Sequence, residues 1–222
     1  MLKPRLKEIY RCLNNCNHIV DVGSDHGYLS IALVQNNKCN FVTNIDINSA
    51  PLLVGQNNVI KLGLDNKINF CLNNGLKGIK LEPPVDAISI SGMGANNIIS
   101  IIQNNNDNIP IQYVVQANNH SFQIREFIKQ MDYFINNETI VMENKITYEI
   151  ISFVTNKKSN LLTDADIHIG PVLKLSNNVH FKEMLINKYI KLKKIVDLTK
   201  NVSIIKHYQV IKSFLYEKKW IS

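Results

Sequence analysis

The chain has 222 residues, of which 45% are hydrophobic and 19% are charged, and its formal net charge is +7. These values are ordinary for a folded globular protein and predict one domain with an appendage, or two small domains. No apolar run approaches the roughly 20 residues needed to span a bilayer, and no secretory signal is recognisable, so we expect a cytoplasmic protein without a membrane partner.

The first predicted element is a short amphipathic helix over residues 2–13. Its apolar side carries Leu6, Ile9, Tyr10 and Leu13, and Pro4 suits a first helical turn. The basic residues of this helix are Lys3, Arg5, Lys7 and Arg11. Two roles are open and compatible: a lid that packs on the domain, or a basic edge that faces phosphates beside a ligand cleft.

Residues 18–36 read as a strand, a glycine turn and a helix. The strand covers 18–22, the turn lies between Gly23 and Gly27, and the helix follows. Asp25 stands where a dinucleotide-binding turn would carry its middle glycine. A carboxylate there repels a pyrophosphate at the helix N-terminus. The turn therefore favours a positively charged, phosphate-free ligand, and S-adenosylmethionine is one.

A second strand, 39–45, ends at Asp46. This residue lies 23 positions beyond Gly23, near the separation at which an acidic residue receives ribose hydroxyls in Rossmann-type sites. An isolated Asp at a strand end is more often a helix N-cap. Together with the glycine turn, the spacing favours binding of an adenosine ribose.

Further strands are predicted at 68–72, 85–90 and 112–117, and the expected helices cover 49–62, 95–102 and 121–131. The stretches 73–75 and 91–94, Asn-Asn-Gly and Ser-Gly-Met-Gly, follow two of these strands. They should lie at the carboxyl edge of the sheet, where open α/β sheets bind ligands. Two final strands, 134–142 and 146–155, have no helix between them, which favours the antiparallel close of a methyltransferase sheet over a dehydrogenase.

The C-terminal part reads as a linker, or a loop that packs back on the sheet, over 161–175, followed by two helices. Their apolar residues recur at helical spacing and are Phe181, Leu185, Tyr189, Leu192, Val196, Ile204, Tyr208, Ile211 and Leu215. The predicted fold is α/β: a Rossmann-like, doubly wound sheet with an antiparallel last strand over residues 1–160, then a linker and an α-helical coiled-coil hairpin over 161–222.

The excess positive charge sits in this hairpin. From Lys182 onward ten lysines face three acidic residues, whereas residues 1–181 carry fifteen of each sign. A basic appendage on a neutral body indicates a polyanionic partner, nucleic acid first, although a solvated lysine-rich face is the plain alternative. The four cysteines form no CxxC pair or Cys/His cluster, so we expect buried thiols and no metal.

Six stretches, in the same order, resemble the bacterial tRNA (adenine-22-N1)-methyltransferase family (TrmK). They are residues 21–29, 87–94, 115–118, 124–128, 148–150 and 169–171. The resemblance implies a class I S-adenosylmethionine-dependent methyltransferase that methylates N1 of an adenine in the D-arm region of tRNA. Ala117, Ala95 and Asn74 depart from the family's usual Pro, Gly and Asp. The Asn74 carbonyl can still accept a hydrogen bond from the adenine amine of the cofactor.

Three sets of site residues follow from these patterns and from the resemblance. The expected cofactor-binding residues are Asp21, Gly23, Ser24, Asp25, His26, Gly27, Tyr28, Asp46, Ile47, Asn74, Gly75, Ser91, Gly92 and Met93. The expected catalytic residues are Asp25, Met93 and Glu149. The expected RNA-binding residues are Lys3, Arg5, Lys7, Arg11, Arg125, Lys188, Lys191 and Lys194.

Individual roles within these sets differ. Asp21 is expected to fix the glycine turn by accepting backbone N–H bonds, and contact with the methionine ammonium is its rival role. Asp25 either caps the following helix or offers negative potential to the reaction, with even weight on each. A base in a tRNA stem must be extruded to react, and Tyr28 or His120 could stack on it.

Adenine N1 already carries a lone pair, and its methylation leaves a cation. The reaction therefore needs positioning and negative potential, and no strong base. We expect a monomer that uses S-adenosylmethionine and binds no metal. The alternatives are a methyltransferase on another RNA or a small molecule, and a non-catalytic RNA-binding module with a vestigial cofactor site.

Overall fold

A computed structural model describes residues 2–105, 107, 109–158 and 161–221. Its elements are, in chain order, α1 (Pro4–Cys12), β1 (Cys16–Val22), α2 (Tyr28–Gln35), β2 (Cys39–Asp46), α3 (Ser49–Lys61), β3 (Ile68–Leu72), β4 (Ala87–Met93), α4 (Ala95–Gln103), β5 (Gln112–Ala117), α5 (Ser121–Gln130), β6 (Phe134–Glu143), β7 (Ile146–Val154), α6 (Asp164–His168), η1 (Leu173–Leu175), α7 (Val179–Val196) and α8 (Val202–Glu217).

The strands form one seven-stranded sheet in the order β3-β2-β1-β4-β5-β7-β6. Neighbours from β3 to β5 pair in parallel, whereas β7 runs antiparallel to both β5 and β6. The predicted doubly wound sheet with an antiparallel close is therefore confirmed. Strand order reverses between β1 and β4, which creates the switch point where such sheets bind ligands.

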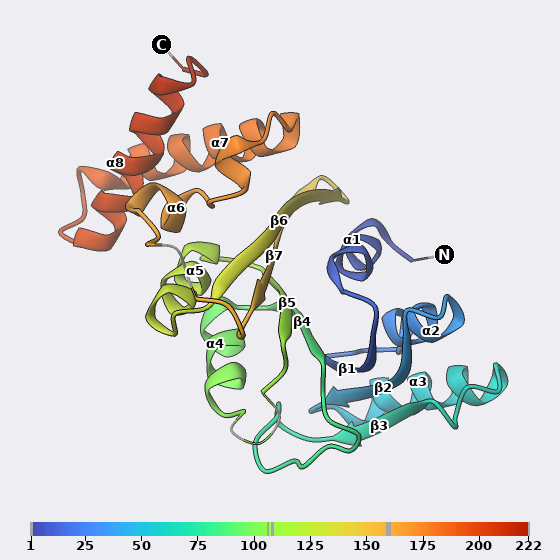
Figure 1. Ribbon diagram of the computed structural model, residues 1–222. Coiled ribbons are helices and arrows are strands. Elements are labelled where there is room, and N and C mark those ends of the chain that lie inside the picture. The colour runs from blue at the N-terminus through green and yellow to red at the C-terminus, as the bar shows by residue number, and fades with distance from the viewer. Residues whose placement is uncertain (1, 106, 108, 159–160, 222) are drawn as a thin grey trace.

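Helices cover both faces of the sheet (Figure 1). One face packs against α1, α2 and α3 through apolar side chains such as Ile9, Leu33 and Val59. The other face packs against α4 and α5, for example through Ile98 and Ile124. Strands covered on both faces read as continuous apolar runs, which is why they stand out in the sequence.

The C-terminal segment has a separate apolar core, built from α7, α8, the segment before them and Ile140 of β6. Phe181, Leu185, Ile211 and Leu215 are buried in it. The rings of Tyr189 and Tyr208 stack at 5.5 Å between centroids, so the two helices pair along the predicted stripes. In Figure 1 this group lies beyond β6 and β7, away from α2 and α3.

The segment expected to be a linker contains a short helix, α6. Thr163 and Asp166 form a capping box at its start, in which each side chain receives the other's backbone N–H. The predicted domain boundary at residue 160 lies outside the described residues. Within the described chain, no helix is both long and apolar enough to cross a membrane.

Two buried histidines join α6 to α8. The Nδ1 atoms of His168 and His207 lie 2.9 Å apart, so one ring donates and the other accepts. Both rings also contact Phe122 from α5. Burial lowers the pKa of His207 to about 3, with the positive charge of Lys188 as a further cause.

Because His207 is buried in its neutral form, we expect the free energy of unfolding to decrease in acid. The unfolded His207 binds a proton near pH 6.5, whereas the folded one stays neutral down to about pH 3. Its stabilising contribution is complete above pH 6.5 and decreases as the pH falls, by about 2 kcal/mol at pH 5. Urea unfolding at pH 7 and pH 5 measures this, and His207→Phe should lose less stability between the two values. An identical pH dependence in both proteins would contradict the assignment.

Candidate active site

A cavity of about 530 Å³ lies at the carboxyl edge of the sheet, beside the switch point between β1 and β4. Its volume is typical of a small-molecule site, roughly 300–1,000 Å³. The predicted cofactor-binding residues that line it are Gly23, Asp46, Ile47, Asn74, Gly75, Ser91, Gly92 and Met93. Residues from four separate chain segments are thus brought to one place.

The first glycine of the turn allows a close approach at this cavity. Gly23 has a φ of +75°, and a Cβ atom there would lie 2.5 Å from the Cε atom of Met93. The neighbouring Ser24 is buried, and its hydroxyl has no hydrogen-bond partner among the described residues. The Gly23 turn lets a bound ligand approach the backbone closely. Ser24 adjoins this turn but does not itself line the cavity, and its unpaired hydroxyl fits a ligand that reaches past Gly23.

The second glycine serves packing. A Cβ atom at Gly27, whose φ is +71°, would lie 3.3 Å from the ring of Phe70 on β3. Gly27 does not line the cavity. Because Gly27 has no side chain, the Phe70 ring can lie close to it, and its backbone can adopt the left-handed conformation that precedes α2.

Asp21 lies behind the cavity. It is 4% exposed, and the Ser89 hydroxyl of β4 donates a hydrogen bond to its carboxylate. Burial raises the pKa of Asp21 to about 7; the Ser89 hydrogen bond moderates this shift and the charge of Asp46 reinforces it. The observed partner of Asp21 is thus a side chain on the next strand, where backbone N–H groups of the turn were expected. A positive charge placed nearby would favour its ionised form.

Asp46 organises two turns at the rim of the cavity. One carboxylate oxygen accepts the backbone N–H of Asn48 at 2.9 Å, and the other lies 3.4 Å from the backbone nitrogen of Asp25. Asp46 therefore links the end of β2 to the glycine turn after β1. Its position at the carboxyl end of β2 is where a ribose-binding carboxylate stands in Rossmann-type sites.

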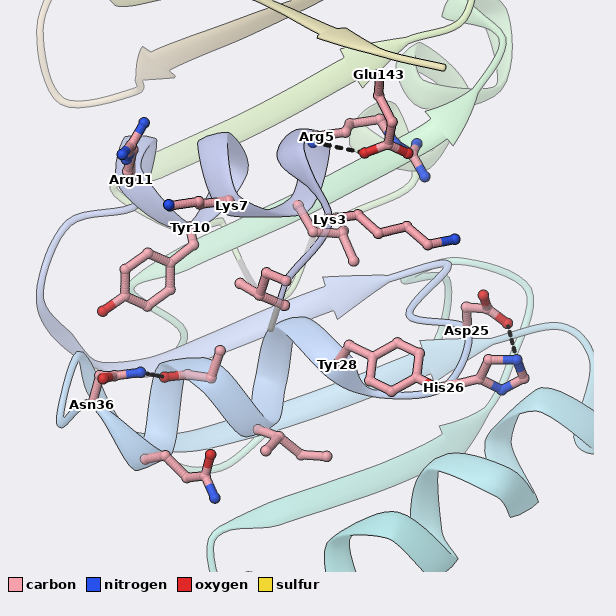
Figure 2. Close-up of a pocket in the computed structure, with 15 residues that line it drawn as sticks. Lys3, Arg5, Lys7, Tyr10, Arg11, Asp25, His26, Tyr28, Asn36 and Glu143 are labelled. Carbon is pink, nitrogen blue, oxygen red and sulfur yellow. Dashed lines mark hydrogen bonds and ion pairs between the residues drawn. The ribbon is translucent and has the colours of Figure 1, made fainter.

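A second hollow, a groove of about 910 Å³, lies between α1 and α2. Asp25, His26 and Tyr28 line this groove and do not line the cavity. Asp25 has a φ of +53°, so the turn directs these three residues away from the cavity. Figure 2 shows them at the end of the groove where Lys3 and Arg5 also lie.

The Asp25 side chain does not cap α2. The N-cap of this helix is Gly27, and no side chain makes a capping hydrogen bond there. The Asp25 carboxylate lies 3.5 Å from Nε2 of His26 and is well exposed. The capping role considered for Asp25 is therefore wrong, and its carboxylate is available to the groove.

Two residues to which the sequence assigned no role hold the Gly92 turn. The buried Gln116 accepts hydrogen bonds from the Gly92 backbone N–H at 3.1 Å and from the Arg5 guanidinium at 2.7 Å. Asn118 donates a hydrogen bond to the Gly92 carbonyl at 2.7 Å. The sequence feature that could have identified these two residues is the family-like stretch 115–118, at the end of β5. Arg5 is thus fixed at the sheet edge between cavity and groove.

Three predicted residues lie elsewhere. Arg125 is completely buried, and its guanidinium binds Glu138 at 2.6 Å and Glu149 at 2.9 Å. It cannot contact RNA phosphates, so that prediction is wrong. Glu149 lines neither hollow, and its charge is neutralised by Arg125 and by Lys188 at 3.2 Å, which corrects its catalytic assignment. Lys188, which was predicted to bind RNA, already pairs with Glu149.

The charge on Glu149 is held firmly. Burial alone would raise the pKa of Glu149, yet Lys188 and Arg125 lower it to about 2.

The remaining predicted RNA contacts divide into two groups. Lys3, Arg5, Lys7 and Arg11 line the groove, whereas Lys191 and Lys194 are exposed on α7.

The antiparallel close of the sheet and a carboxylate-bearing glycine turn separate this chain from dinucleotide-dependent dehydrogenases. They place it among the class I S-adenosylmethionine-dependent methyltransferases. The profile of the family TrmK, described as tRNA (adenine(22)-N(1))-methyltransferase, matches residues 19–219. The chain belongs to this family.

Known relatives agree with this membership. The tRNA (adenine(22)-N(1))-methyltransferase of Bacillus subtilis is 29% identical over 186 residues, which cover 81% of this chain and 78% of the relative. TrmK of M. capricolum, solved with S-adenosyl-homocysteine, is 30% identical with a TM-score of 0.87 over 100% of both chains. A putative tRNA (m1A22) methyltransferase of Streptococcus pneumoniae, solved with S-adenosyl-L-methionine, is 26% identical with a TM-score of 0.88 over 97% of this chain and 100% of that one.

Proposed function

We propose that this chain transfers the methyl group of S-adenosylmethionine to N1 of the adenine at tRNA position 22. The observation that carries the proposal is the meeting of the Gly23 turn, Asp46 and the turn around Gly92 at one cavity, in a chain that belongs to the TrmK family. We propose that the enzyme acts as a monomer, because one chain holds both the cavity and the basic groove. We also propose that it acts in the cytoplasm.

S-adenosylmethionine supplies an electrophilic methyl group on a sulfonium. In our proposal Asp46 accepts hydrogen bonds from the ribose hydroxyls, and the Asn74 carbonyl accepts one from the adenine amine. Gly23 lets the backbone approach, and the Ser24 hydroxyl gains a partner. Met93 packs against Gly23 and forms the wall between the cofactor and the target base.

The chain's remaining task is to hold the adenine and to tolerate its charge. N1 attacks with its own lone pair, so no side chain has to remove a proton first. Asp25 belongs to the glycine turn and lines the end of the groove nearest the cavity. We propose that it stabilises the positive charge that develops on the adenine ring. Arg5 and Gln116 hold the Gly92 turn in place.

The C-terminal helices are proposed to hold the tRNA body. Lys191 and Lys194 are exposed on α7, and the region from 182 to 222 carries the chain's excess positive charge. Contacts between lysines and phosphates depend strongly on salt and carry no sequence information. We therefore assign affinity to these helices and choice of base to the sheet edge.

The decisive experiment is mass spectrometry of tRNA incubated with the protein and labelled S-adenosylmethionine. We expect one 1-methyladenosine per tRNA, located at position 22, and none in a transcript that carries guanine at that position. Methylation of a different base or a small molecule would replace the proposed substrate. Failure to bind the cofactor in calorimetry would support the non-catalytic alternative.

Asp46→Asn tests the ribose assignment. Asparagine keeps an oxygen for the Asn48 N–H but loses the charge, so cofactor affinity should decrease about tenfold, as hydrogen bonds to charged groups contribute roughly 1.5–3 kcal/mol. Calorimetry with S-adenosyl-homocysteine measures the dissociation constant. Affinity for tRNA should stay unchanged and serves as the control. Equal cofactor affinity in both proteins would remove Asp46 from the site.

A further inference from the structure

We propose that the groove between α1 and α2 binds an unpaired RNA strand that adjoins the target nucleotide. The enzyme would thus open the D-arm over several nucleotides instead of extruding a single base from an intact stem. This inference rests on the proposed function and goes beyond it, because it assigns a separate hollow to a stated form of the substrate.

The groove adjoins the reaction centre. Asp25 lines the groove, and its backbone nitrogen lies 3.4 Å from the carboxylate of Asp46, which lines the cavity. Arg5 also lines the groove and binds Gln116, which holds the Gly92 turn of the cavity. A strand in the groove would therefore have one end at the methyl donor.

Charge along the groove is graded. At the end near the cavity the acids Asp25 and Glu143 balance the cations Lys3 and Arg5, and Glu143 accepts the backbone N–H of Arg5 at 2.9 Å. Lys7 and Arg11 lie toward the other end (Figure 2). This arrangement suits a base that becomes positively charged at one end and phosphates that follow at the other.

Three of the four cations that line the groove are accessible, and the fourth, Arg5, already binds Gln116. Lys3 and Lys7 are exposed, and their ammonium groups make no ion pair or hydrogen bond within the described part of the chain. Arg11 forms an exposed pair with Glu8 at 3.0 Å, one turn away on the same helix, and such a pair contributes little. From Lys3, the residue just before α1, to Arg11 the distance along the helix axis is about 12 Å, which is enough for more than one backbone phosphate.

An exposed aromatic ring faces the same groove. Tyr28 is 52% exposed, although it opens a helix whose other face is buried. Its only ring contact among the described residues is a T-shaped one with His26, at 5.8 Å between the ring centroids. Tyr10, also in the groove, has Lys38 over its ring at 4.6 Å. Tyr28 is therefore the ring with a face open for stacking.

A basic groove with an aromatic stacking platform is the arrangement that proteins use for single-stranded nucleic acids. Double-stranded RNA is instead recognised through its shape, phosphates and 2′-hydroxyls across the minor groove. Tyr28 would be idle against a duplex, since paired bases do not present their faces. The groove therefore favours an unpaired strand.

The test compares binding of a short unpaired RNA oligonucleotide with binding of its duplex. The wild-type chain should bind the single strand more tightly. Tyr28→Ala should weaken single-strand binding about tenfold, because stacking on an aromatic ring is lost, and should leave the salt dependence unchanged. The double variant Lys7→Gln, Arg11→Gln should weaken it similarly and reduce the salt slope by about 1.4, since each phosphate contact contributes roughly 0.7.

The matched control is Lys61→Gln, Lys67→Gln, which removes the same charge at the exposed end of α3 and the turn before β3, outside both hollows. It should behave as the wild type. Equal binding of duplex and single strand, unchanged binding in Tyr28→Ala, or equal losses in the two double variants would each overturn the groove assignment. Failure of the proposed function is distinguishable, because the wild-type chain would then form no 1-methyladenosine in tRNA.

Discussion

Replacing Arg125 with leucine should destabilise the protein by about 3–5 kcal/mol, because it leaves buried carboxylates without their partner. Arg125 is 0% exposed and binds Glu138 and Glu149, which lie on two adjacent strands. Burial opposes its charge, yet the two carboxylates hold the pKa of Arg125 above its usual value. Against a typical total stability of about 5–15 kcal/mol, this loss is large.

The effect should extend to the C-terminal segment. Glu138 also accepts the backbone N–H of Val172 at 2.9 Å, and a Cβ atom at Gly170 would lie 2.5 Å from the Glu138 carboxylate. Lys188 of α7 binds Glu149. Arg125 is therefore the centre of a buried ionic cluster that joins the sheet to the helices beyond it.

Urea unfolding midpoints of single and combined variants measure the Arg125 effect. Arg125→Met combined with Glu138→Gln and Glu149→Gln removes the three buried charges and should regain part of the stability, since no buried charge is then left without its counterion. Lys188 also loses its partner, but its side chain is 29% exposed and water can solvate it. Lys61→Leu, an exposed change on α3, should cost at most about 0.5 kcal/mol. If the triple variant is no more stable than Arg125→Leu, lost packing and not unpaired charge explains the result.

The architecture could be predicted because its signals are local. Each of the five parallel strands ends at, or is followed by, glycine, Asp or Asn, and the 112–117 strand was predicted with its observed bounds. The antiparallel close followed from two strands predicted with only residues 143–145 between them; in the structure Glu143 still belongs to β6, and residues 144–145 form the turn to β7. Spacing likewise placed Gly23, Asp46 and the Gly92 turn around one cavity.

The errors arose where partners come from distant parts of the chain. Arg125 looks like a surface cation at the sequence level, because Glu138 and Glu149 reach it only once the strands pair. The sequence also could not predict that the expected cofactor-binding residues are divided between a cavity and a separate groove. It depends on the left-handed backbone of Asp25 and on α1 packing beside α2, and neither follows from residue spacing.

The second large effect is expected at Asp25. Asp25→Asn should reduce kcat about 10- to 100-fold, because it removes the negative potential proposed to stabilise the developing adenine cation; loss of one such group in other enzymes costs roughly 100- to 1,000-fold. The lower range is chosen because the carboxylate is well exposed in this structure and water screens it. Single-turnover methylation of tRNA at saturating cofactor measures the rate.

The substitution is designed to leave everything but the charge in place. Asparagine has the size of aspartate and tolerates the left-handed backbone at position 25, where φ is +53°. The matched control is Asp132→Asn, an exposed residue with a φ of +56° outside both hollows, and it should retain full activity. Because no side chain caps α2, the unfolding midpoint and the affinity for S-adenosyl-homocysteine should be unchanged in Asp25→Asn. A lower midpoint with an intact rate would show instead that Asp25 stabilises the turn, and the developing charge would then have to be met by Glu143, the other carboxylate that lines the groove.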